Sequence, residues 1–108
     1  MRDVRISEDA IEDLNHGYLF YEAQEPGLGD YFTACLRADI EGLKISAGIH
    51  RVVYHDYHRL LSRIFPCGIF YTIEQDRAVV WAVIDLRRSP EWVRLRLAGQ
   101  DRTSGSSQ

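Results

Sequence analysis

Residues 65–92, FPCGIFYTIEQDRAVVWAVIDLRRSPEW, decide the fold of this chain. They contain two apolar segments, 67–74 and 78–86, separated by a polar stretch at 75–77 that is typical of a tight turn. Two such segments joined by a tight turn predict a pair of antiparallel strands. Residues 78–86 are the most apolar part of the sequence, so we expect the second strand to lie inside a sheet rather than at its edge.

The segments on either side of this pair extend the pattern. Residues 58–65 predict a further strand and so a three-stranded antiparallel meander, whereas the aromatic-rich residues 49–57 have no clear period and predict a loop. After the meander, residues 89–91 (Ser-Pro-Glu) supply an N-cap, a proline at the first helical position and an acidic first turn. These residues predict a last helix over about 90–97.

The N-terminal part of the chain predicts one strand and two helices. Val4 and Ile6 alternate with polar residues, as in a short strand, and Ser7 can cap the helix that follows. Two stripes of apolar residues then recur at steps of three and four, on either side of an interruption at residues 25–27 (Glu-Pro-Gly). Two helices joined by so short a turn form an antiparallel hairpin.

The predicted order is β-α-α-β-β-β-α, an α+β fold in which the helical hairpin packs on one face of a four-stranded, mainly antiparallel sheet. The other face of the sheet is expected to be open. Strict alternation along the last strand would place Trp81 and Val83 on the same face. We expect a single domain over residues 1–98 and a flexible polar tail over residues 99–108.

Composition and charge bound the class of protein. The chain has 108 residues, 45% apolar and 27% charged, which fits one soluble domain and excludes a disordered chain, a coiled coil and a membrane-spanning helix. No apolar leader opens the sequence, so we expect a cytoplasmic protein that does not engage a membrane. The net charge of −3 is unevenly spread: residues 1–44 hold ten acidic and four basic residues, and residues 45–108 hold six and nine. The basic part therefore predicts a surface that meets a partner.

Cysteines and histidines do not have the spacing of a metal site. Cys35 and Cys67 lie far apart without a C-x-x-C motif, so we expect two buried free thiols. The segment 50–58 contains residue types found in metal and acid–base sites, namely His50, His55, Asp56 and His58. Their spacing is loose and no rigid frame is predicted around them, which favours solvated loop histidines. We expect neither a metal ion nor a cofactor.

Basic and aromatic side chains near the end of the meander are candidates for binding a partner. The arginines of the meander and its exit are Arg59, Arg63, Arg87 and Arg88. Guanidinium groups hold phosphates and carboxylates in a fixed fork, so these side chains either bind an anionic partner or form salt bridges within the fold. Trp92 and Arg96 lie one helical turn apart. Trp92 either anchors the last helix to the sheet, the favoured interpretation, or acts with Arg96 as a binding hot spot.

The sequence resembles the RelE/ParE toxin superfamily, and most closely its ParE-like, plasmid-stabilisation branch. The resemblance covers residues 2–98 and rests first on the order of strand, helical hairpin and meander. It rests further on residues 65–71 (FPCGIFY) and on residues 85–92 (DLRRSPEW) with Arg96 behind them. That branch often carries Phe-Pro-Tyr-x-Ile-x-Tyr in the meander and ends in Arg-Arg-x-Pro-x-x-Trp-x-x-Arg.

This chain departs from the branch pattern at four positions. Cys67 stands where the branch usually has tyrosine, and Asp85 stands where it often has histidine. Trp92 lies two rather than three positions beyond the proline, and Arg96 lies four rather than three beyond Trp92.

The resemblance implies a small bacterial toxin of a type II toxin–antitoxin module, silenced by a cognate antitoxin whose C-terminal segment wraps it. RelE-like members of the superfamily cut messenger RNA on the ribosome, whereas ParE-like members poison DNA gyrase by protein–protein contact and are not enzymes. RNA cleavage needs a base, an acid and cations at the phosphate. No tyrosine or histidine follows Tyr71, Lys44 is the single lysine, and the negative net charge does not favour ribosome binding.

On these grounds we expect a non-enzymatic gyrase inhibitor. The residues expected to contact its target are Arg59, Arg63, Arg87, Arg88, Trp92 and Arg96. Two alternatives stay open. One is an inactive homologue that binds antitoxin alone. The other is a RelE-like, ribosome-dependent endoribonuclease acting on messenger RNA, with catalytic groups drawn from His55, His58, Arg59, Arg63 and Arg87.

Overall fold

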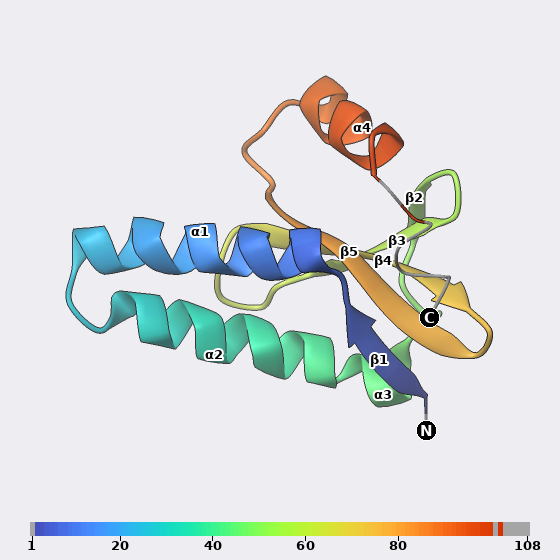
Figure 1. Cartoon of the computed structure of the whole chain (residues 1–108), viewed down its shortest axis with the longest axis horizontal. Helices are drawn as coiled ribbons and strands as arrows, with labels where there is room; N and C mark the ends of the chain where they lie inside the picture. The colour runs from blue at the N-terminus through green and yellow to red at the C-terminus, as the bar shows by residue number, and fades with distance from the viewer. Residues whose placement is uncertain (1, 101, 103–108) are drawn as a thin grey trace.

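The computed structural model of the chain describes residues 2–100 and 102, which form one sheet with helices on both of its faces (Figure 1). The elements in chain order are β1 (Asp3–Ile6), α1 (Glu8–Gln24), α2 (Leu28–Glu41), α3 (Leu43–Ser46), β2 (Val52–Tyr54), β3 (Tyr57–Leu61), β4 (Cys67–Glu74), β5 (Arg77–Asp85) and α4 (Pro90–Ala98). The strands lie in the order β1-β5-β4-β3-β2. β1 runs parallel to β5, and the other neighbouring pairs are antiparallel. The predicted α+β class is confirmed.

β4 and β5 form the strand pair that residues 65–92 predict. They pair from Glu74 opposite Arg77, beside the turn, to Cys67 opposite Asp85 at the other end. The two turn residues, 75 and 76, have φ angles of 52° and 61°. Two left-handed residues in a two-residue turn match the right-handed twist of the strands they join, so the turn fixes the register of the hairpin.

A β-bulge in β5 changes which of its side chains share a face. Tyr71 of β4 pairs with Val80, and the register shifts next to this pair, so that Trp81 is an extra residue in β5. Trp81 therefore packs in the core under α4, whereas Val83 packs in the core under the helical hairpin. The expectation that these two side chains share a face is wrong, because the bulge interrupts the alternation.

α1 and α2 form the predicted hairpin against one face of the sheet. α1 begins at Ser7, whose Oγ accepts the N–H of Ala10 at 3.1 Å. The two helices approach closely at Gly17, where an added Cβ would lie 2.4 Å from the ring of Phe32. Side chains of both helices and of the sheet fill the core between them, including Ala10, Leu14, Phe32, Leu36, Ile40, Ile69, Tyr71 and Val80.

The sheet has five strands rather than four, because residues 52–54, expected in a loop, form β2. β2 pairs with β3 across a tight turn that His55 enters with a φ angle of 48°. The sequence lacks the glycine or asparagine that usually marks a left-handed turn position, which is why the turn was not predicted. β3 ends at Leu61 rather than at residue 65.

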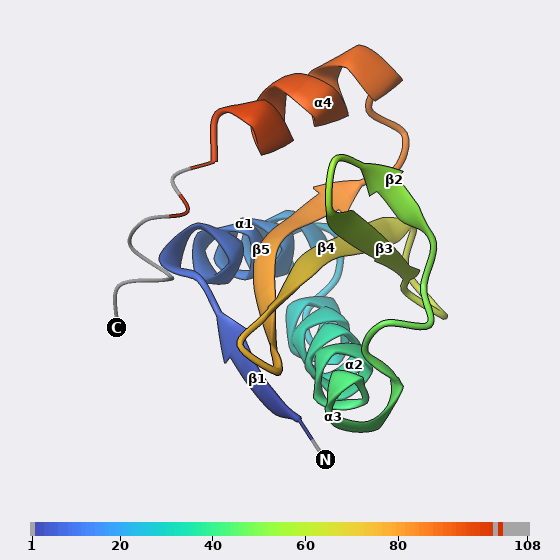
Figure 2. The ribbon, with the colours of Figure 1, turned by 90° about the vertical axis from the view of Figure 1, so that its right-hand side faces the viewer.

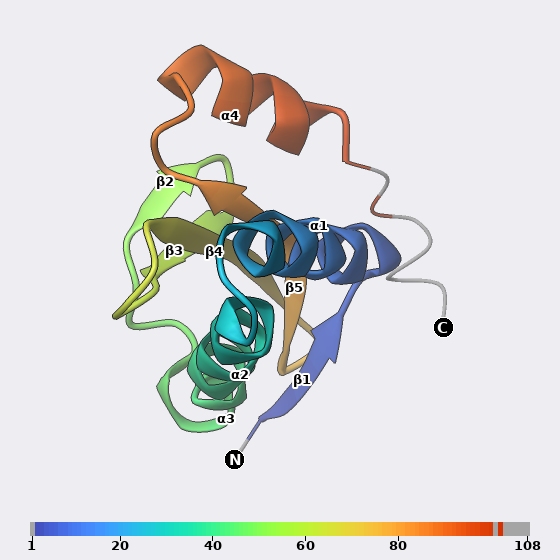
Figure 3. The same cartoon turned by 90° about the vertical axis from the view of Figure 1, so that its left-hand side faces the viewer.

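The second face of the sheet is covered by α4, so the expectation of an open face is wrong. Figures 2 and 3 show the sheet between α2 and α4. Leu97 is 2% exposed and packs with Val93 against a second core that contains Tyr57, Phe70, Val79, Trp81, Ala82 and Ile84. Trp92 is 38% exposed, so Leu97 rather than Trp92 anchors the helix.

Residues 100 and 102 of the predicted tail make contacts with the body of the domain, and Gly99 caps α4. Gln100 donates from Nε2 to Oδ2 of Asp9 at 2.7 Å, and Arg102 forms ion pairs with Asp56 and Glu74. The rest of the predicted tail, residues 101 and 103–108, lies outside the described residues. Within the described part of the chain, no helix is long and apolar enough to cross a membrane.

Candidate functional site

A groove of about 1020 Å³ lies between α1 and α4, with the end of β5 between them. We call it the α1–α4 groove. Its α1 side presents Asp9, Glu12, Asp13, His16, Phe20 and Tyr21, and its α4 side presents Trp92, Leu95 and Arg96. Phe20 and Leu95 are 53% and 68% exposed, so apolar side chains face solvent across the groove. Asp85, Arg87 and Arg88 close one end.

An ion pair between Asp13 and Arg96 holds the two walls together. Arg96 donates from Nη1 to Oδ1 of Asp13 at 3.0 Å and from Nη2 to Oδ2 at 2.7 Å, a bidentate geometry. Oδ2 of Asp13 also accepts the backbone N–H of Val83 at 2.9 Å. The Arg96 side chain is 24% exposed and that of Asp13 is 14% exposed. Arg96, expected to contact the target, is therefore engaged inside the fold.

The end of the groove presents two arginines in fixed orientations. Arg87 donates through its backbone N–H and its guanidinium to Asp85, and Nη2 lies 2.6 Å from Oδ2. Hydrogen bonds from the Arg87 side chain hold the pKa of Asp85 below its usual value, and the same contact raises the pKa of Arg87. Arg88 stacks its guanidinium 4.3 Å from the ring centroid of Trp92, in cation–π geometry. Arg87, Arg88 and Trp92 are exposed at this end of the groove, and Asp85 is half-buried beside them.

The titratable side chains on the inner wall of the groove, Cys67 and Tyr21, are held in their neutral forms at neutral pH. Burial raises the pKa of the Cys67 thiol to about 11, so the thiol is protonated at neutral pH and is a poor nucleophile. Burial also raises the pKa of Tyr21, which packs its ring against Phe32 and Phe65. His16 is exposed on α1 and is the histidine that lines the groove.

Arg59 and Arg63 do not join Arg87 and Arg88. Neither lines the α1–α4 groove. Arg59 pairs opposite Phe70 in the sheet and is half-buried, whereas Arg63 follows the end of β3 and places Nε 3.5 Å from Oδ1 of Asp39 on α2. The four arginines expected to cluster are therefore divided between separate parts of the molecule.

Of the three histidines of residues 50–58, His50 and His58 both contact Tyr71, whereas His55 packs on Tyr54. His58 has Nδ1 2.8 Å from the carbonyl oxygen of His50 and stacks its ring on Tyr71, with centroids 5.0 Å apart. Nδ1 of His50 lies 2.6 Å from the Tyr71 hydroxyl, and burial, followed by the charge of His58, lowers the pKa of His50. His55 lies in the β2–β3 turn and packs edge-on against Tyr54. The described residues contain no group of three or more His, Cys, Asp or Glu side chains able to hold a metal ion.

The α1 wall of the groove, which includes Asp13, His16 and Phe20, was not predicted from the sequence. These residues belong to a helix whose polar and apolar side chains look like those of any solvated amphipathic helix. Asp13 meets Arg96 across 83 positions of sequence, so no local motif could reveal the pair.

Comparison with known proteins gives a match by structure. No protein family and no curated protein sequence matches the chain. A solved structure described as "Chromosomal ParDE TA system from P. aeruginosa" is similar to it, with a TM-score of 0.75 and 14% sequence identity. The match covers 80% of this chain and 97% of that chain. This similarity confirms the RelE/ParE-like fold expected from the sequence.

Proposed function

We propose that this chain is the toxin of a type II toxin–antitoxin module, acting in the bacterial cytoplasm, neutralised by a cognate antitoxin and able to stabilise a plasmid. The fold carries the proposal: a chain from a ParDE system of P. aeruginosa is matched over 97% of its length. The sequence supports the same reading independently, because residues 85–92 resemble the C-terminal pattern of ParE-like toxins.

We propose further that the toxin inhibits DNA gyrase by protein–protein contact through Arg87, Arg88 and Trp92. Tryptophan and arginine are the residue types that contribute most binding energy at protein interfaces. Arg88 and Trp92 are already stacked, so less conformational entropy is lost when a partner covers them. Arg96 is left out of the proposed contact set because it pairs with Asp13, and Arg59 and Arg63 because they lie away from the groove.

The α1–α4 groove is the proposed docking site of the antitoxin. Phe20 and Leu95 expose apolar surface there, and an amphipathic segment placed between α1 and α4 would cover it. An occupant of the groove would also cover Arg88 and Trp92, which line it. Neutralisation would then follow from occlusion of the residues proposed to contact gyrase.

The direct test compares two activities of the purified protein side by side: inhibition of DNA supercoiling by gyrase, and cleavage of ribosome-bound messenger RNA. We expect the first and not the second. Replacing both Arg87 and Arg88 by alanine should weaken gyrase inhibition at least about tenfold, the effect of losing an interface hot spot. Arg94→Ala is the matched control, since Arg94 is an exposed arginine nearby in sequence, on α4, that does not line the groove.

The nuclease alternative has its own signature in this assay. If the chain is a nuclease, it cleaves ribosome-bound messenger RNA, and the rate of cleavage falls on the order of 100-fold when its acid–base side chain is removed. His16→Ala tests the histidine of the groove, and His55→Ala and His58→Ala test the two named from the sequence. Cleavage abolished by one of these changes would replace the gyrase proposal. Loss of both activities in a protein that still binds its antitoxin would identify an inactive homologue.

A further inference from the structure

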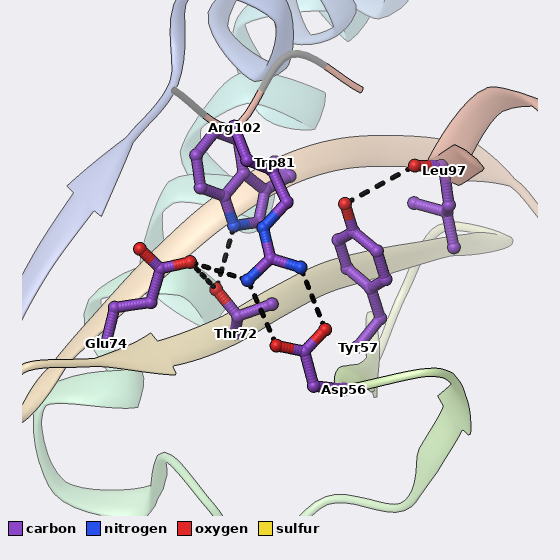
Figure 4. A network of polar contacts seen from close by, with 7 residues as sticks. All are labelled: Asp56, Tyr57, Thr72, Glu74, Trp81, Leu97 and Arg102. Atoms are coloured by element: carbon purple, nitrogen blue, oxygen red, sulfur yellow. Dashed lines mark hydrogen bonds and ion pairs between the residues drawn. The ribbon is translucent and has the colours of Figure 1, made fainter. Parts of the chain in front are cut away.

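A second polar site lies on the α4 face of the sheet and is built around the guanidinium of Arg102 (Figure 4). Arg102 donates from Nη1 to Oδ1 of Asp56 at 2.8 Å and from Nη2 to Oδ2 at 3.0 Å, a bidentate pair. Nη2 also donates to Oε2 of Glu74 at 2.7 Å. One guanidinium therefore meets two carboxylates, one from the β2–β3 turn and one from the end of β4.

Two aromatic rings complete the surroundings of this guanidinium. Cζ of Arg102 lies 5.2 Å from the ring centroid of Tyr57 and 5.7 Å from that of Trp81. Both distances are within the range of cation–π attraction, and both rings are buried. Carboxylates for the N–H fork and aromatic rings beside the planar group are the features that distinguish arginine from lysine as a ligand.

Three of the four side chains around Arg102, those of Tyr57, Glu74 and Trp81, are held in place by bonds that do not involve Arg102. Nε1 of Trp81 donates to Oγ1 of Thr72 at 2.9 Å, and that hydroxyl donates to Oε2 of Glu74 at 2.9 Å. Thr72 and Trp81 are fully buried, so these two hydrogen bonds orient the Glu74 carboxylate from the interior of the domain. The hydroxyl of Tyr57 reaches the carbonyl oxygen of Leu97 at 3.4 Å. Strands β3, β4 and β5 thus hold Tyr57, Glu74 and Trp81 in place without Arg102, and Asp56 adds its carboxylate from the β2–β3 turn.

We propose that Asp56, Tyr57, Glu74 and Trp81 form an arginine-binding site, that Arg102 occupies it as an internal ligand, and that an arginine side chain of a partner protein can take its place. We call this the arginine site. The inference goes beyond the proposed toxin function and uses none of the groove residues, so either can fail without the other.

Exchange of the ligand is physically accessible. The Asp56 side chain is 59% exposed, that of Arg102 is 33% exposed and that of Glu74 is 22% exposed, so an incoming guanidinium can reach Asp56 first while Arg102 leaves. Aspartate and glutamate side chains are ordinarily ionised at neutral pH, so the two carboxylates of the site attract a cation once Arg102 has left. The internal ligand acts at an effective concentration of order millimolar, as for short tethers. A partner that binds elsewhere on the domain as well can overcome such competition.

The test uses the full-length chain with Arg102→Ala, which empties the site. The probe is N-acetyl-L-arginine methylamide, with the corresponding lysine derivative as control. The readout is the NMR signal of the Trp81 indole N–H, which donates to Thr72 at the base of the site. The chain has two tryptophans, so the indole signal that remains in a Trp92→Phe variant belongs to Trp81. We expect a saturable shift with the arginine probe, at least tenfold weaker binding of the lysine probe, and at least tenfold weaker binding to the chain that retains Arg102.

Asp56→Asn and Glu74→Gln, added to Arg102→Ala, should abolish the shift. Equal binding of the two probes, equal binding with and without Arg102, or binding that survives loss of both carboxylates would each overturn the proposal. If the Arg102→Ala chain is unstable, the melting temperature becomes the readout. A melting temperature that rises with the arginine probe but not with the lysine probe supports the arginine site. Any other result shows that Arg102 is a structural residue that does not exchange with a partner's arginine.

Discussion

Asp13 of α1 bonds to both β5 and α4. Its carboxylate accepts two hydrogen bonds from Arg96 and one from the backbone of Val83. β1 ends at Ile6, which pairs with Val80, so the N–H of Val83 lies beyond the parallel strand and needs another acceptor. The Asp13 carboxylate supplies this acceptor, so a side chain replaces the backbone carbonyl that a longer β1 would have offered to Val83.

Replacing Asp13 by alanine should lower the free energy of unfolding by about 2–3 kcal/mol. The change removes hydrogen bonds to a charged group and leaves the N–H of Val83 and the guanidinium of Arg96 without their acceptor. Urea denaturation measures the loss. Glu12→Ala, an exposed change on the neighbouring position of the same helix, should stay within about 0.5 kcal/mol. Equal stabilities of the two variants would show that the pair does not hold the groove together.

The Cys67 thiol should be inert in the folded protein. Its pKa is raised by burial to about 11 from an ordinary value near 9. At pH 8 the thiolate fraction is therefore about 100-fold lower than in the unfolded chain. In a Cys35→Ser background, alkylation by iodoacetamide should be slower by at least about this factor than in urea. A rate close to the unfolded one would contradict the buried position of Cys67.

The same shift sets a pH dependence of stability. Below pH 9 the thiol is protonated in both states and its contribution is complete. Between about pH 9 and 11 the Cys67 thiol ionises in the unfolded chain but stays protonated in the folded one. The free energy of unfolding therefore falls as the pH rises through this range. A comparison of Cys67→Ala with the unchanged chain across this range isolates the effect of the thiol.

At the scale of elements, the helical hairpin depends on the absence of a side chain at Gly17. An added methyl group would lie 2.4 Å from Cε2 and Cζ of Phe32, which is fully buried. Gly17→Ala improves helix propensity by about 1 kcal/mol but overpacks the crossing by about 1–3 kcal/mol, so we expect net destabilisation. Thermal unfolding measures it.

The matched experiment is a double-mutant cycle with Phe32→Leu. The smaller side chain makes room for alanine at position 17, so the double variant should be more stable than the sum of the single effects predicts. If the destabilisations of the two single variants simply add, the methyl group at position 17 does not clash with the Phe32 ring, and the helices have moved apart instead.

α4 should be held by Leu97 and not by Trp92. Leu97 is 2% exposed within the second core, and truncation of such a residue to alanine costs about 2–5 kcal/mol. Trp92 is partly exposed and stacks on Arg88, so Trp92→Ala should cost less than Leu97→Ala. Melting temperatures of the two variants rank them. The opposite ranking would restore Trp92 as the anchor.

Elements that carry their own local signals were predictable from the sequence. The β4–β5 turn is polar and tight, and α4 begins as expected, with Ser89 capping the N–H of Trp92 at 3.1 Å and Pro90 as the first helical residue. β2 was missed because its turn uses His55 in a left-handed conformation. The bulge at Trp81 leaves no trace in the apolar pattern, because the segment around it is apolar on both faces.

The candidate site was predictable where its residues are neighbours in sequence. Arg87, Arg88 and Trp92 lie within six positions and share one end of the groove. Arg59 and Arg63 were grouped with them because the meander was assumed to be regular, but β3 ends at Leu61 and Arg63 turns towards α2. The wall formed by α1 depends on contacts across 70 and 83 positions, which no spacing rule can supply.

At the scale of the whole molecule, the uneven charge of the sequence becomes a division across the groove. The α1 wall carries Asp9, Glu12 and Asp13, the α4 wall carries Arg96, and Arg87 and Arg88 lie at one end. Asp13 and Arg96 already pair with each other, so a partner that fills the groove meets the remaining charges together with the exposed apolar side chains of Phe20 and Leu95. Such a surface selects its occupant by charge as well as by shape.

The measurement that tests the central claim most directly is the count of viable bacteria after induced expression of this chain alone. We predict that growth stops, that co-expression of a cognate antitoxin restores growth, and that Arg94→Ala arrests growth as the unchanged chain does. The Arg87→Ala, Arg88→Ala variant should fold with nearly unchanged stability, because both side chains are exposed, and should fail to arrest growth. Normal growth in cells that accumulate the unchanged chain in folded form would contradict the claim that it is a toxin.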